Sequence, residues 1–60
     1  MRLQDMGEWE LLERAARAMF AAVCMPVGSV ERCLLWAAHD AYMGELRQRA
    51  YRVLATAGHR

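Results

Sequence analysis

Two apolar stripes in the second half of the chain point to opposite sides of a helix. The first stripe recurs at spacings of four, three and four residues, and consists of Val30, Leu34, Ala37 and Ala41. The second stripe follows Gly44 and consists of Leu46, Ala50, Val53, Leu54 and Ala57. At about 100° per residue, one continuous helix would direct the second stripe roughly opposite to the first. Either the chain bends near Gly44 and forms a third helix, or one long helix has different partners on its two sides. We favour the bend.

The first half of the chain has the pattern of one amphipathic helix. Asp5 and Glu8 have the spacing of a capping box, which predicts a helix that begins at about Met6. A stripe with heptad-like 3-4-3-4 spacing follows and is expected to face the core: Trp9, Leu12, Ala16, Met19 and Val23. Two acid–arginine pairs four residues apart, Glu10–Arg14 and Glu13–Arg17, occupy the opposite side. Residues 18–25 are apolar nearly all round, so we expect them to be buried on more than one side.

A short turn separates this helix from the next. Pro26 disfavours helical backbone at the residue before it, and Ser29 is a good N-cap for a helix that starts at Val30. So short a connection makes the two helices antiparallel neighbours, with the stripe of residues 30–41 against the first helix. We therefore predict an all-α fold in one domain, residues 1–60. It is an antiparallel helical hairpin plus a third helical segment, a small three-helix bundle with helices at about 6–25, 30–43 and 45–57.

Composition suggests that this fold is incomplete on its own. A chain of 60 residues buries only about 60% of the surface that it exposes when unfolded. Its apolar fraction of 57% exceeds the usual 45–50%, which points to an interface in addition to a core. The longest uncharged run covers residues 18–30 and is too short to span a bilayer. With no visible signal peptide, we expect a cytoplasmic protein that does not enter a membrane.

The residues with chemical potential form no recognisable active site. Cys24 and Cys33 flank the turn and could form a disulfide, but in the cytoplasm we expect two reduced, buried thiols. With His39 they lack the usual spacing of metal ligands, so we expect neither a metal nor a cofactor. His39 and Asp40 are adjacent on a helix and about 100° apart, and no pattern places a nucleophile beside them. The protein is therefore not expected to be an enzyme.

The excess of apolar surface favours a protein-binding function. We expect a small non-catalytic interaction module, an inhibitor or adaptor that docks on a larger protein and also associates with itself as a homo-oligomer. So short a chain is compatible with a phage or mobile-element origin. Aromatic and arginine side chains dominate interface energetics, and the residues expected to bind the partner are Trp36, Met43, Leu46, Arg47, Arg49 and Val53.

The alternative function is DNA binding through a minimal helix-turn-helix. A turn at Gly44 would make residues 45–57 a recognition helix, with Arg47, Arg49 and Arg52 available for nucleic acid. Asp40 in the preceding helix and a net charge of only +1 count against this alternative.

Overall fold

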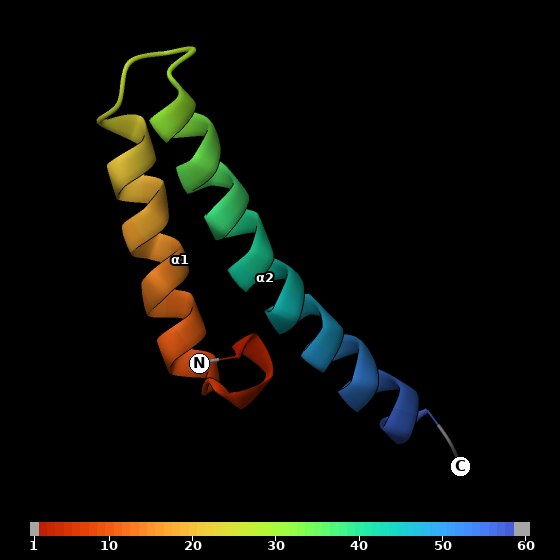
Figure 1. The fold of residues 1–60 in the computed structure, drawn as a ribbon. Coiled ribbons are helices and arrows are strands. Elements are labelled where there is room, and N and C mark those ends of the chain that lie inside the picture. The colour runs from red at the N-terminus through yellow and green to blue at the C-terminus, as the bar shows by residue number, and fades with distance from the viewer. Residues whose placement is uncertain (1, 59–60) are drawn as a thin grey trace.

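The computed structural model describes residues 2–58 as a helical hairpin. A short 3-10 helix, η1 (Leu3–Asp5), precedes two α-helices, α1 (Glu8–Val23) and α2 (Val30–Ala57). The two α-helices run antiparallel, with the connecting turn at one end of the molecule and η1 beside the start of α1 (Figure 1). The all-α class and the antiparallel hairpin are confirmed.

The predicted bend at Gly44 is wrong. Helix α2 runs for 28 residues without interruption, so residues 30–43 and 45–57 belong to one helix and the described chain contains no third α-helix. A helical glycine costs only about 1 kcal/mol relative to alanine. Gly44 does not adopt the positive φ that a tight turn uses, and a Cβ built on it would meet no atom within 4 Å. Its good helix-forming neighbours therefore carry the helix through this position.

The helix ends agree with the sequence only in part. The Ser29 hydroxyl accepts a hydrogen bond from the Arg32 amide at 3.2 Å, which confirms the predicted N-cap. The predicted capping box is wrong, because Asp5 lies in η1 and α1 begins at Glu8 after Gly7, which has no capping side chain. Gly28 in the turn has a φ of 85°, a conformation that favours glycine. Helix α1 also stops at Val23, two residues earlier than expected.

The core uses a different face of α1 from the one predicted. The buried residues of the described chain are Met6, Leu11, Ala15, Ala18 and Ala22. The heptad-like stripe is exposed instead, with 79% of Trp9 and 55% of Val23 accessible to solvent. Two helix backbones approach most closely where side chains are small, and three alanines at 15, 18 and 22 provide such a face. The wider stripe that includes Trp9 is left outside.

Helix α2 is also rotated relative to the prediction. Val30 and Leu34 are 70% and 65% exposed, so the stripe of residues 30–41 faces solvent rather than α1. Half-buried residues on the opposite side face α1, among them Leu35, Ala38, Tyr42 and Leu46. The second apolar stripe, beginning at Leu46, therefore continues the side of α2 that packs on α1. The inversion of the pattern at Gly44 is real, but it separates an outer face from an inner one.

The inner face of α2 is longer than its partner. At 1.5 Å per residue, α2 is about 42 Å long and α1 about 24 Å. The last two turns of α2, residues 50–57, extend beyond the start of α1 (Figure 1). The molecule measures 50 × 20 × 15 Å, and its radius of gyration of 14.1 Å exceeds the roughly 10 Å expected for a compact chain of this length. We call residues 50–57 the overhang.

Candidate docking groove

An apolar groove lies where the overhang leaves α1. It has a volume of about 620 Å³. Its lining residues come from α2, except for one residue at the start of α1: Leu46, Arg49, Ala50, Val53, Leu54 and Glu8. Val53 and Leu54 are 67% and 65% exposed, so the groove presents large apolar side chains to solvent. We call this the end groove.

One wall of the end groove is held by Arg49. Its Nε donates to the Glu45 carboxylate at 2.9 Å and its Nη1 to the Glu8 carboxylate at 3.1 Å. Its Nη2 donates to the carbonyl oxygens of Leu3, Gln4 and Met6. Arg49 thus joins α2 to η1 and to the first residue of α1, and its donors are used within the chain.

The charges of this wall stabilise one another. Hydrogen bonding to the backbone amide at the start of α1, and then to Arg49, lowers the pKa of Glu8. The hydrogen bond that Arg49 donates to the Glu45 carboxylate is the main reason why the pKa of Arg49 is raised. The Glu45 side chain is only 8% exposed and also contacts Arg52 at 3.3 Å. The groove therefore has an apolar floor beside a preformed network of ion pairs.

The six residues expected to bind a partner fall in two places. Leu46, Arg49 and Val53 lie together in the end groove. Trp36 and Met43 are half-buried nearer the start of α2. There the Trp36 ring meets the His39 ring edge-on at a centroid distance of 5.3 Å. The sixth residue, Arg47, is exposed.

Three groove residues were absent from the expected set. Ala50 and Leu54 belong to the same apolar stripe as Val53, so the stripe itself could have identified them. Glu8 could not have been found in this way, because it reaches the groove only through the hairpin contact with Arg49, 41 residues away.

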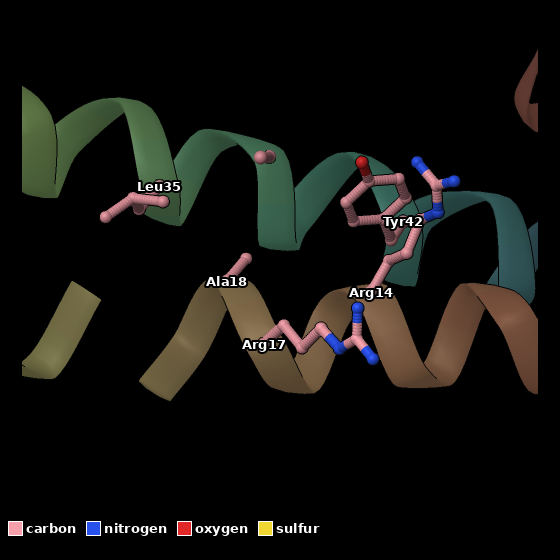
Figure 2. A pocket seen from close by; sticks show the side chains of 6 residues that line it. Arg14, Arg17, Ala18, Leu35 and Tyr42 are labelled. Atoms are coloured by element: carbon pink, nitrogen blue, oxygen red, sulfur yellow. The ribbon is translucent and has the colours of Figure 1, made fainter. Parts of the chain in front are cut away.

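One flank of the hairpin carries two arginine side chains beside a hollow between the helices. On this flank, a hollow of about 440 Å³ is lined by Arg14, Arg17, Ala18, Leu35, Ala38 and Tyr42. Figure 2 shows Arg14 and Arg17 of α1 on the same side of the hairpin as Tyr42 of α2. Arg14 and Arg17 also pair with Glu10 and Glu13 at 3.3 and 2.7 Å, as the sequence predicted. We call this the arginine flank.

The remaining chemical candidates stay separate from the end groove. Cys24 and Cys33 are unpaired and exposed, which corrects the expectation of buried thiols. His39 Nδ1 lies 3.3 Å from Asp40 Oδ1, so these neighbours do contact each other, contrary to the sequence argument. Among residues 2–58, no hydrogen bond joins His39 to a serine or cysteine, and no three potential ligands form a metal-binding group.

Within the described residues, neither α1 nor α2 is both long enough and apolar enough to cross a bilayer.

Comparisons of the chain with models of known protein families, with curated proteins and with solved structures found no match. The proposals below therefore depend on the geometry of the hairpin.

Proposed function

We propose that this protein is a non-catalytic interaction module, an inhibitor or adaptor, that docks on a larger protein through the end groove. The observation that carries this proposal is the overhang. It extends the inner, apolar face of α2 beyond the helix that covers the rest of that face. Exposed contiguous apolar surface of this kind is typical of binding sites.

The large accessible surface area of the chain supports the proposal that a partner covers part of it. A compact monomer of 6.9 kDa exposes about 4,000 Å². This chain exposes 4861 Å², an excess of roughly 900 Å². A standard protein interface buries about 800 Å² on each side. The excess therefore equals the contribution of one partner to a specific complex.

The groove also favours a particular type of partner surface. Leu46, Val53 and Leu54 would receive an apolar side chain or the apolar face of a helix, which is a common way for helical grooves to bind peptides. Beside the groove, Arg49 and Arg52 pair with Glu8 and Glu45, so the positive and negative charges balance. We infer a partner segment with one or two large apolar residues.

A matched pair of substitutions tests this function. Val53→Asp places a charge in the groove, whereas Gln48→Asp places the same charge on an exposed position on another side of α2. A partner isolated from the source cell is purified and titrated calorimetrically with both variants. We expect Val53→Asp to weaken binding about 100-fold and Gln48→Asp to leave it unchanged. Equal affinities for the two variants, or no partner with Val53-dependent binding, would contradict the proposal.

The helix-turn-helix alternative loses its geometric basis. That motif needs a turn between two helices, and α2 is continuous through Gly44. The turn that does exist, at residues 24–29, joins antiparallel helices (Figure 1).

A further inference from the structure

The flank opposite the arginine flank carries large apolar side chains on both helices. Leu12 precedes Arg14 by two residues and Met19 follows Arg17 by two, so each lies about 160° around α1 from an arginine. Trp36 likewise precedes Ala38 by two residues on α2, and Met43 lies seven residues after Trp36, in line with it. Because Arg14, Arg17 and Ala38 line the arginine flank, these four apolar residues lie on the other one. The exposed stripe of α1 completes this apolar flank: Trp9, Leu12, Ala16, Met19 and Val23.

A hollow on this flank has the geometry of a coiled-coil hole. It has a volume of about 390 Å³ and is lined by Trp9, Leu12, Glu13 and Ala16. These residues stand at positions i, i+3, i+4 and i+7 of one helix. Four residues in this arrangement form the hole that receives one knob from a facing helix in a coiled coil. The stripe that surrounds the hollow has the matching 3-4-3-4 spacing.

We propose that the facing helix is α1 of a second copy of this chain, antiparallel to the first, so that two hairpins form a four-helix bundle. One copy supplies both parts of the contact: the hole near Trp9 at one end of the stripe, and a knob, Val23, that is 55% exposed at the other end. In a dimer with a two-fold axis, the knob of each copy fills the hole of the other. The same contact is then made twice, as in any self-complementary interface.

The side chains favour the antiparallel orientation over the parallel one. With Val23 of the second copy in the hole, Leu12 lies across from that valine and Ala16 lies across from Met19, so each layer pairs side chains of different size. The first half of one helix, which holds three glutamates, faces the second half of the other, whose one charged residue is Arg17. A parallel pair would instead bring Glu8 of one copy close to Glu13 of the other, and like charges at such flanking positions repel.

The proposed dimer interface lies on a different face of the hairpin from the end groove. Docking of a larger protein and self-association can therefore fail independently.

Sedimentation equilibrium between 1 and 100 μM tests the dimer. Met19→Glu places a charge in the proposed interface, and Leu34→Glu places the same charge on the exposed outer face of α2, where Leu34 is 65% accessible. We expect wild type and Leu34→Glu to sediment as dimers and Met19→Glu to dimerise about 100-fold more weakly. Circular dichroism should show that all three proteins keep the same helix content. A 6.9 kDa wild-type monomer at 100 μM would overturn the proposal, and so would equal weakening by both substitutions.

The orientation is tested with a nitroxide label on Cys24 in the Cys33→Ser protein, since both thiols are unpaired and exposed. In the antiparallel pair the two labelled positions are offset by 13 residues, about 20 Å along the helix axis. A parallel pair would place them about 10 Å apart, the spacing of packed helices. Electron–electron dipolar spectroscopy separates these distances, and the shorter one would overturn the antiparallel arrangement. Val53→Asp, which tests the end groove, should leave the dimer intact.

Discussion

The two α-helices of this hairpin differ in how much they bury. Helix α1 has four buried residues in sixteen, whereas α2 has none in twenty-eight. The shorter helix is therefore the one with a defined core face, and the longer one offers it only half-buried residues. A helix as long as α2 gains most of its stability from packing against other elements. Helix α2 therefore has surface for more contacts than α1 supplies.

The greatest loss of stability is expected for a substitution on the buried face of α1. Leu11 is fully buried, and Leu11→Ala should lower the free energy of unfolding by about 2–5 kcal/mol because it leaves a cavity between the helices. Leu34→Ala, on the exposed face of α2, should cost less than about 1 kcal/mol. Urea denaturation of both variants at one protein concentration measures the difference. Similar losses would mean that the assignment of inner and outer faces is wrong.

Substitutions at the N-caps of the two helices should have the next largest effect on stability. Ser29→Ala removes the side-chain cap of α2 and should cost about 1 kcal/mol. Gly7→Ala should cost less than this, because no side-chain hydrogen bond is lost and a Cβ there would meet no atom within 4 Å, although alanine is a poorer N-cap than glycine. Thermal melts followed by circular dichroism compare the two. A cost for Gly7→Ala as large as that for Ser29→Ala would contradict the assigned caps.

Gly44 tests the continuity of α2. Gly44→Ala should stabilise the protein by up to about 1 kcal/mol, since alanine is the better helix former and the added Cβ has open space. The midpoint of urea denaturation should rise. A fall in the midpoint would instead indicate a turn at Gly44 and restore the third helix.

The smallest effect concerns the ion pair that joins the helices. The folded pKa of Glu8 is lowered, first by its hydrogen bond to the backbone at the start of α1 and then by Arg49, so these contacts stabilise the protein at neutral pH. This contribution should disappear as the pH falls below about 4.5 and through the folded pKa of Glu8. Melting temperatures of wild type and Glu8→Gln should therefore differ at pH 7 and converge once the pH is below the folded pKa of Glu8. A constant difference across this range would show that Glu8 acts in another way.

The sequence predicted the helical class, the turn and the Ser29 cap because each depends on residues close together in the chain. It did not predict which face of α1 is buried, because α1 carries two competing apolar stripes and periodicity alone does not rank them. The stripe with Trp9 is the more hydrophobic, but the one with Ala15 and Ala18 allows closer packing. The bend at Gly44 was inferred from the need to bury both stripes in one small chain, and that need does not hold for a chain that leaves a stripe exposed.

The candidate groove was predictable to a similar degree. Leu46 and Val53 followed from the second stripe, whose inner position depends on the continuity of α2. The sequence could not show the role of Arg49, because its contacts with the carbonyl oxygens of Leu3, Gln4 and Met6 join residues more than 40 positions apart.

The uninterrupted length of α2 also fixes how two docking sites would be spaced. In an antiparallel pair of hairpins, the two overhangs project from opposite ends of the assembly. The continuous helices would keep the distance between them constant. Such a pair is a bivalent ligand. It would bind a partner that displays two copies of its target at the matching distance far more tightly than one hairpin could, through effective concentration rather than new contacts.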